Sequence, residues 1–309
     1  MQTTSLLEDK TGIHKADLAM YEAKAGGRNT FCYTDKDLSS TALERATLYN
    51  AIRLGLNNHE FEIYFQPIVD CTTLEVSYLE ALIRWNHPGL GLVLPGKFIP
   101  MAEGSELIIE LTKFVIYEVF KTSHEMHKLN ENFPPIAINY SLKVLKSDAI
   151  FHLFKKYMKQ YDGHKNPPII ELTEREFIVS DETNKQNLSR YKELGIKFSM
   201  DDFGTGYSNL GYLIENPFDT LKIDRSFISK IGKDVKSDDV IKATISIAKT
   251  LGLNTVGEGI ETQGQLEFLR ENGCNFAQGF YLNMPVFISD LKDKLLSNGN
   301  IKLDKKAPK

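Results

Sequence analysis

The chain has 309 residues, of which 42% are hydrophobic, 25% charged and 10% aromatic. This composition is typical of a globular protein and excludes disordered and fibrous classes, and the length suits one large barrel of strands and helices. The net charge of −4 gives no global positive field, so we expect no long nucleic acid as a partner, although bound cations can let an acidic pocket accept a phosphorylated ligand.

The first expected element is a helix over residues 16–25, where apolar residues recur at helical spacing until two glycines end the pattern. A polar linker, TDKDLSS, follows. Thr41 and Glu44 have the spacing of a capping box, which predicts that a second helix begins there and runs to Asn57. This second helix opens the main domain.

Eight short segments with strand character come next, and helix-sized intervals separate most of them from the second onward. They are residues 62–69, 76–85, 136–140, 168–173, 197–202, 220–224, 254–258 and 275–279. This alternation predicts an α/β fold with parallel pairing, closed as a TIM-like (β/α)8 barrel. Because only the residues DCTTLE separate the first two segments, we expect an antiparallel hairpin there and a barrel whose first strand is reversed.

Polar side chains lie where apolar strands end. In the second strand, period-two alternation places Glu80 and Arg84 on one face, so Glu80 indicates a metal or a partnering base; the alternative is an exposed ion pair between the two. The later strand ends add further polar groups, namely Asn139, Glu171, Asp201, Asp202, Lys222, Glu258 and Gln278. In α/β barrels this rim carries the active site, and an all-oxygen ligand set favours Mg²⁺ or Mn²⁺ over zinc.

Two features of this rim suggest phosphoryl chemistry. The adjacent Asp201 and Asp202 would let one carboxylate bridge two metals while its neighbour holds the second. Lys222 would orient or deprotonate a water molecule, or neutralise charge on a phosphate, and the sequence leaves these roles open. The alternatives are a plain turn for the aspartate pair, and a surface ion pair with Asp219 or Asp224 for the lysine.

The cysteines and the hydropathy bear on location. Cys32, Cys71 and Cys274 form no CxxC pair, which favours a reducing, cytoplasmic setting. The sequence has no run of eighteen apolar residues and no signal peptide, so we expect no membrane contact by this chain. This expectation does not exclude a membrane-anchored parent protein.

Ordered motifs within residues 60–288 resemble those of the EAL phosphodiesterases. They are YFQPIV, EALIRW from Glu80, INYS, ELTE, DDFGTGYSNL, LKID, EGIET and QGFYLNMP. The resemblance implies a barrel with an antiparallel first strand, cyclic di-GMP as substrate and linear pGpG as product. No signature position is substituted, which argues against a member that binds without catalysis.

The resemblance also implies roles for individual residues. The metal ligands for two Mg²⁺ or Mn²⁺ ions are Glu80, Asn139, Glu171, Asp201 and Asp202, and Glu258 assists through a metal or a bound water. The catalytic group is completed by Lys222, which positions or activates the water, by Gln278 beside that water, and by Glu174, which steadies the DDFGTG loop. The residues that contact substrate are Gln66, Leu82 and Arg84.

The sequence also predicts how the chain divides into domains. Residues 16–29 resemble the last helix and turn of a GGDEF cyclase domain, but the cyclase signature itself is missing. We therefore expect a GGDEF remnant and linker (1–36), an EAL barrel (37–295) and a flexible tail (296–309). The resemblance implies that the chain derives from a longer GGDEF–EAL parent and has no cyclase activity. Family members often pair through the region after DDFGTG, which implies a homodimer near residues 207–240.

Two rival functions are a cyclic di-GMP receptor without turnover and an unrelated metal-dependent barrel hydrolase.

Overall fold

A computed structural model describes residues 36–175, 182–205 and 210–297. The expected helix over residues 16–25 and the GGDEF-like segment lie outside the described residues, as do residues 298–309 of the expected tail. The tail boundary at residue 296 is wrong, because residues 296–297 belong to the last helix. The strands are β1 (Phe61–Asp70), β2 (Val76–His87), β3 (Gly91–Val93), β4 (Ile136–Tyr140), β5 (Ile169–Thr173), β6 (Lys197–Phe203), β7 (Thr220–Ile223), β8 (Asn254–Gly257) and β9 (Phe276–Ala277). The helices are α2 (Lys36–Asn57), the 3-10 turn η1 (Pro95–Lys97), α3 (Ile99–Glu103), α4 (Leu107–Leu129), α5 (Leu142–Leu145), α6 (Asp148–Gln160), α7 (Glu182–Lys192), α8 (Leu210–Glu215), α9 (Arg225–Ile228), α10 (Val235–Thr250), α11 (Gln263–Glu271) and α12 (Ile288–Ser297).

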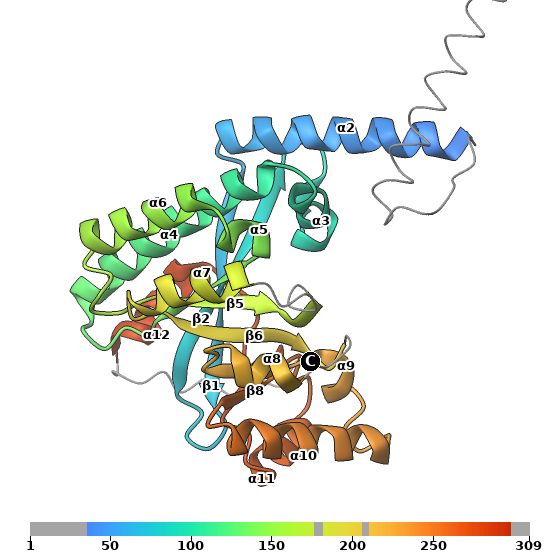
Figure 1. Cartoon of the computed structure of the whole chain (residues 1–309), viewed down its shortest axis with the longest axis vertical. Coiled ribbons are helices and arrows are strands. Elements are labelled where there is room, and N and C mark those ends of the chain that lie inside the picture. The colour runs from blue at the N-terminus through green and yellow to red at the C-terminus, as the bar shows by residue number, and fades with distance from the viewer. Residues whose placement is uncertain (1–35, 176–181, 206–209, 298–309) are drawn as a thin grey trace, which may run out of the picture.

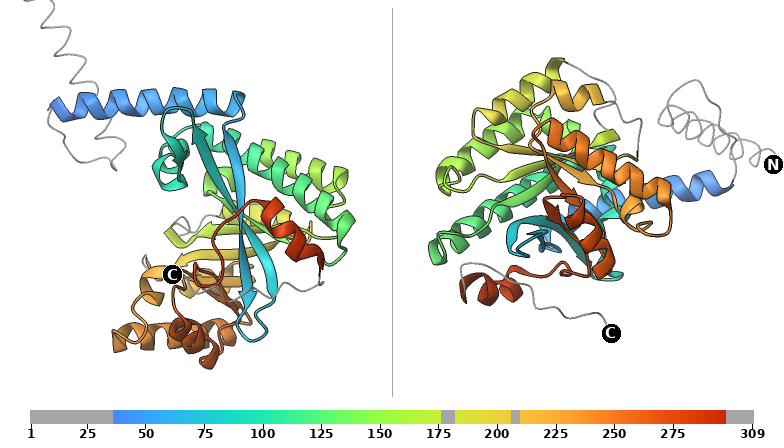
Figure 2. Two further views of the ribbon diagram at one scale, coloured as in Figure 1. Left: turned by 180° about the vertical axis from the view of Figure 1, so that it is seen from behind. Right: turned by 90° about the horizontal axis from the view of Figure 1, so that it is seen from below.

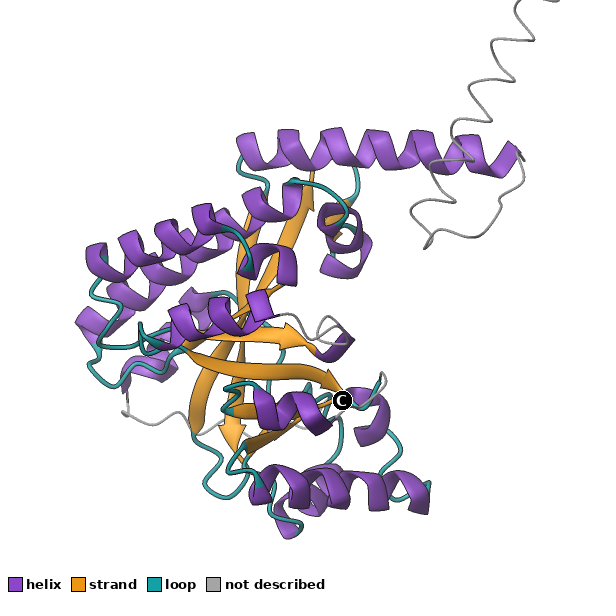
Figure 3. Ribbon diagram, viewed as in Figure 1, coloured by secondary structure: helices purple, strands orange, loops and turns teal. Residues whose placement is uncertain are grey.

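The strands close into a barrel with helices packed around it (Figure 1, Figure 3). The order around the barrel is β1-β9-β8-β7-β6-β5-β4-β2, and pairing of β2 with β1 completes the ring. Strand β1 is antiparallel to both of its neighbours, whereas the remaining pairs around the ring are parallel. The predicted TIM-like barrel with a reversed first strand is therefore confirmed.

The β1–β2 hairpin is the longest strand pair of the barrel and carries one side of the site. Its register pairs Gln66 with Glu80, so the two side chains lie side by side on the same face. All eight predicted strands are present. The sequence reading missed β3, a three-residue strand that pairs with residues 85–87, because so short a segment has no measurable alternation.

Helix α2 begins earlier than predicted. It starts at Lys36, so Thr41 lies inside the helix and the proposed capping box is wrong, as is the reading of TDKDLSS as a non-helical linker throughout. No proline or glycine stands between Lys36 and Thr41 to stop the helix. Both views in Figure 2 show α2 projecting away from the barrel.

The apolar core has two parts. The larger part fills the space between the barrel and the helices, where Phe120, Phe154 and Tyr191 are fully buried. The smaller part plugs the inside of the barrel and consists of Ile68, Tyr78, Ala137, Ile169 and Val256, with Phe276 packed against it. None of the described helices is both long and apolar enough to cross a bilayer.

Gly279 follows β9 where two backbone segments touch. A Cβ atom at this position would overlap the backbone N and O of Ile260, and this contact is fixed by hydrogen bonds from Ile260 N to Gln278 O (3.0 Å) and from Tyr281 N to Ile260 O (2.9 Å). We expect Gly279→Ala to lower the free energy of unfolding by at least about 3 kcal/mol, measured by urea denaturation. Gly264→Ala is the matched control, because its Cβ meets nothing within 4 Å, and it should change stability by no more than about 1 kcal/mol. Equal stability of the two variants would contradict this view of the contact.

Candidate active site

The centre of the site is a buried lysine surrounded by carboxylates. Lys222 on β7 is 0% exposed, although a lysine is seldom fully buried unless it is paired. Its Nζ lies 2.7 Å from Glu258, 2.8 Å from Glu171, 3.4 Å from Asp201 and 3.5 Å from Glu80. These carboxylates come from β2, β5, β6 and the residue after β8, so the barrel closure itself assembles them.

The charges in this cluster do not balance. Burial alone would lower the pKa of Lys222, but the surrounding carboxylates, Asp201 foremost, raise it well above its ordinary value. Burial raises the pKa of Glu171 to about 8 despite Lys222, with Glu80 and Asp201 adding to the rise. Burial and then Asp201 likewise raise the pKa of Glu258. The site therefore favours additional positive charge.

Glu80 is held by amide donors. Asn139 Nδ2 donates to its Oε1 (2.8 Å) and Gln278 Nε2 donates to its Oε2 (2.6 Å). Burial opposes ionisation, but Lys222 and these two amides together lower the pKa of Glu80. Gln278 Nε2 also donates to Gln66 Oε1 (3.1 Å), so Gln278 links Gln66 on β1 to Glu80 on β2. Glu80 is thus an oriented, ionised carboxylate.

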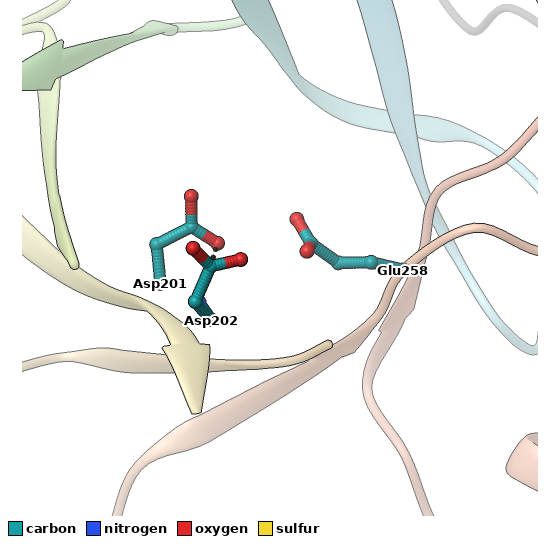
Figure 4. A group of neighbouring side chains, drawn as sticks. All are labelled: Asp201, Asp202 and Glu258. Atoms are coloured by element: carbon teal, nitrogen blue, oxygen red, sulfur yellow. Dashed lines mark hydrogen bonds between the residues drawn. The ribbon is translucent and has the colours of Figure 1, made fainter. Parts of the chain in front are cut away.

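A second group of acids borders the first. One oxygen each of Asp201, Asp202 and Glu258 lie within 4.8 Å of one another, and Figure 4 shows the three side chains converging. Asp202 has a left-handed backbone (φ 56°), and its N–H donates to Asp201 Oδ1 (2.9 Å). Burial, followed by Asp201 and Asp224, raises the pKa of Asp202. This is a constellation able to hold a cation.

The loop after β6 is tied to β5. Gly204 N donates to Glu174 Oε2 (2.8 Å), and Thr205 Oγ1 donates to Asp202 O (2.9 Å). Gly204 has φ +95°, and a Cβ there would lie 2.7 Å from the Phe227 ring, so this position requires glycine. The predicted link between Glu174 and the DDFGTG loop is present, while residues 206–209 of that loop lie outside the described residues.

Two cavities open beside the acids. A cleft of about 230 Å³ is lined by Gln66, Asp202, Asp224, Arg225, Glu258, Gly259, Glu261, Gln278, Gly279 and Phe280. A more apolar cavity of about 310 Å³ includes Leu82 and Asn139 in its wall. Arg84 is half-buried on the same face of β2, with its guanidinium 5.6 Å from the centre of the Tyr64 ring and Nη1 donating to Ile83 O (3.0 Å).

The structure therefore brings together the residues that the strand ends predicted. The exposed Glu80–Arg84 ion pair is wrong, because Glu80 is 6% exposed and bonded to amides. A surface pair between Lys222 and Asp219 is also wrong, because Asp219 binds Lys192 (2.6 Å). A surface pair of Lys222 with Asp224 is equally wrong, since the lysine is fully buried.

Sequence reasoning missed some cleft residues. Arg225 and Glu261 line the cleft. Glu261 lies within the motif EGIET and Arg225 directly follows LKID, but neither residue was given a role. It also gave no role to Tyr78, although alternation placed it on the face of Glu80.

Together, the fold and the site define an α/β-barrel protein with an acidic, oxygen-donor site at the carboxyl ends of its strands. The family model of the EAL domain matches residues 47–285. The chain belongs to the EAL domain family.

Two curated relatives and one solved structure illustrate the similarity. Cyclic di-GMP phosphodiesterase PdeR of Escherichia coli K12 is 35% identical over 274 residues, which is 89% of this chain and 41% of PdeR. The bifunctional diguanylate cyclase/cyclic di-GMP phosphodiesterase MucR of Pseudomonas aeruginosa is 33% identical, over 88% of this chain and 40% of MucR. The solved PaMucR phosphodiesterase in complex with c-di-GMP is 32% identical with a TM-score of 0.75, covering 79% of this chain and 99% of that one. The chain thus spans about two fifths of the length of these curated relatives.

Proposed function

We propose that this chain is a metal-dependent phosphodiesterase that hydrolyses cyclic di-GMP to linear 5′-pGpG. The observation that carries the proposal is the contact of one fully buried lysine, Lys222, with four carboxylates beside the cleft. The solved PaMucR phosphodiesterase, which holds c-di-GMP, supports the choice of substrate.

The donor set fits hard divalent cations. The residues that would hold them all offer oxygen, and they are Glu80, Asn139, Glu171, Asp201, Asp202 and Glu258. The raised pKa values of Glu171, Glu258 and Asp202 mean that added positive charge would stabilise their ionised forms. We propose two Mg²⁺ or Mn²⁺ ions per site. Such ions lower the pKa of water and neutralise charge on phosphate oxygens.

Lys222 would act as a fixed cation. Four carboxylates contact Nζ, which favours its protonated form, and a protonated Nζ would orient the attacking water and neutralise phosphate charge rather than remove a proton. Its contacts with Glu171 (2.8 Å) and Glu258 (2.7 Å) hold Nζ in place, so little reorganisation is needed during the reaction. Of the roles that the sequence left open for Lys222, this assignment keeps orientation of the water and neutralisation of phosphate charge.

The substrate would lie over the rim. Arg84 would contact a phosphate, and Gln66 and Leu82 would line the groove, since Gln66 borders the cleft and Leu82 the apolar cavity. In the reaction the water oxygen forms a bond to phosphorus, the bond from phosphorus to the 3′ oxygen breaks, and that oxygen leaves with a proton. Glu258 and Gln278 border the same cleft and would orient the water.

A direct assay separates this proposal from a receptor without turnover. Purified protein is incubated with cyclic di-GMP and Mg²⁺ or Mn²⁺, and the products are separated by chromatography. We expect pGpG with metal and none with EDTA. Binding of cyclic di-GMP without product under either metal would favour the receptor, and equal turnover of cyclic di-AMP would favour an unspecific barrel hydrolase.

Glu174 would act as a positioning residue for the loop after β6. Glu174→Ala removes the acceptor for Gly204 N, so we expect turnover to fall by about 10-fold or more. Glu174→Gln keeps a carbonyl oxygen for the same bond and should stay within about threefold of wild type. Steady-state kinetics at saturating Mn²⁺ checks both variants, and equal losses would show that the charge, not the hydrogen bond, matters.

Wider features of the protein are also proposed. MucR, named as bifunctional with a cyclase, supports a GGDEF–EAL parent for this chain, and we propose a cytoplasmic location and a homodimer formed near residues 207–240. Light scattering at assay concentrations tests the dimer. A strictly monomeric and fully active protein would contradict it.

A further inference from the structure

One polar side chain stands out within the apolar plug inside the barrel. Tyr78 lies on β2 two residues before Glu80 and on the same face, so it points into the barrel beneath the carboxylates. Its ring packs edge-on against Phe276 with ring centroids 6.0 Å apart. Its hydroxyl group therefore enters the layer between the plug and the acidic site.

Three buried oxygens in this part of the barrel have no hydrogen-bond partner among the described residues. They are Tyr78 Oη, Ser199 Oγ and Glu171 Oε1, from residues that are 5%, 0% and 0% exposed. Leaving such a group unpaired is destabilising, and native proteins rarely tolerate several such groups together. One water molecule shared by the three groups would satisfy them together.

The three groups come from three strands of the barrel, β2, β5 and β6, and their side chains are buried. Glu171 on β5 and Ser199 on β6 are direct partners in the parallel register, and Ser199 lies two residues before Asp201, which also reaches Lys222 from inside the barrel. Tyr78 approaches from β2, which only β4 separates from β5, and its ring shares the apolar plug with Ile169, which lies two residues before Glu171 on the same face of β5.

We propose that Tyr78 and Ser199 are positioning residues for Glu171, acting through one buried water molecule that their hydroxyls and Glu171 Oε1 share. A buried water needs two to four polar partners, and these three supply them. The two hydroxyls donate to the water oxygen, and the water donates to Oε1. Since Lys222 holds Oε2 at 2.8 Å, both oxygens of Glu171 are then fixed.

This inference rests on the proposed function, because it gives Glu171 its orientation as a metal ligand. Groups that orient a ligand from behind typically contribute about 10- to 100-fold to metal affinity. Tyr78→Phe and Ser199→Ala each remove one hydroxyl and keep most of the packing. The measurements are Mn²⁺ affinity by electron paramagnetic resonance, the melting temperature in EDTA, and kcat and KM for cyclic di-GMP.

We expect each single variant to weaken Mn²⁺ binding by about 10-fold. The double variant should bind Mn²⁺ no more than about threefold more weakly than the single variant with the lower Mn²⁺ affinity. The reason is that both substitutions disrupt the same water molecule. The melting temperature in EDTA should fall by no more than about 3 °C, because each substitution removes a single hydrogen bond to the water. Tyr191→Phe is the matched control: its ring is fully buried on α7, outside the barrel, and it should leave Mn²⁺ affinity unchanged.

Three results would overturn the inference. Wild-type Mn²⁺ affinity and turnover in both single variants would exclude a positioning role. Losses that multiply to about 100-fold in the double variant would exclude a shared water. A wild-type protein that binds no Mn²⁺ would overturn the proposed function as well, whereas the first two results would leave that function standing.

Discussion

Replacing Lys222 by methionine is expected to lower kcat for cyclic di-GMP by about 1,000-fold, the loss typical for removing one fixed donor of transition-state charge stabilisation. Methionine fills similar space inside the barrel but supplies no charge to the four carboxylates that Nζ contacts. Single-turnover kinetics at saturating Mn²⁺ measures the effect on the chemical step.

The same substitution should also destabilise the protein. Removing one partner of a buried ion pair costs about 3–5 kcal/mol, so circular dichroism must show that the variant is folded during the assay. Lys185→Ala is the control, because its ion pair with Glu215 is exposed to solvent and should contribute little to stability. A folded Lys222→Met enzyme with wild-type kcat would contradict the assigned role.

Replacing Asp201 by asparagine is expected to separate function from stability. The carboxylate of Asp201 belongs to both acidic groups, and its charge helps to raise the pKa of Glu171, Glu258 and Asp202. We expect turnover to fall by about 1,000-fold because metal binding is weakened. The melting temperature in EDTA should change by no more than about 3 °C, because the relief of like-charge repulsion offsets the lost contact with Lys222 (3.4 Å), and an oxygen acceptor for Asp202 N is kept.

Calorimetric titration with Mn²⁺ measures the metal affinity, and thermal denaturation in EDTA measures the stability. Asp148→Asn provides a carboxylate control on the surface, where Asp148 pairs with Arg190 and is 72% exposed, and both quantities should stay at wild-type values. An Asp201→Asn protein that loses stability in EDTA and keeps its Mn²⁺ affinity would show that the carboxylate is structural.

Much of the site follows from local patterns in the sequence. Period-two alternation placed Glu80 on an inward face, and the polar residues after apolar runs, such as Asn139 and Glu171, lie at one rim because parallel strands end there. The six-residue connection after Val69 forced the hairpin and hence the reversed strand. These inferences need only strand geometry.

Other features depend on contacts that no local pattern encodes. Full burial of Lys222 opposes the usual preference of lysine for solvent, and only barrel closure reveals that four strands supply its counter-charges. The pairing of Glu171 with Ser199 depends on the register of β5 and β6, and the position of Tyr78 beside Ile169 depends on closure of the barrel. The early start of α2 at Lys36 reflects the absence of a helix stop, which a match to the Thr41 capping box concealed.

The most direct test of the central claim is hydrolysis of cyclic di-GMP in ¹⁸O-labelled water with Mn²⁺, followed by mass spectrometry of the product. Attack of water on phosphorus predicts pGpG that carries one ¹⁸O atom, in its 5′-phosphate, and no product from the Asp201→Asn variant at the same time point. Cyclic di-GMP that remains intact in the presence of wild-type protein and Mn²⁺ would contradict the account.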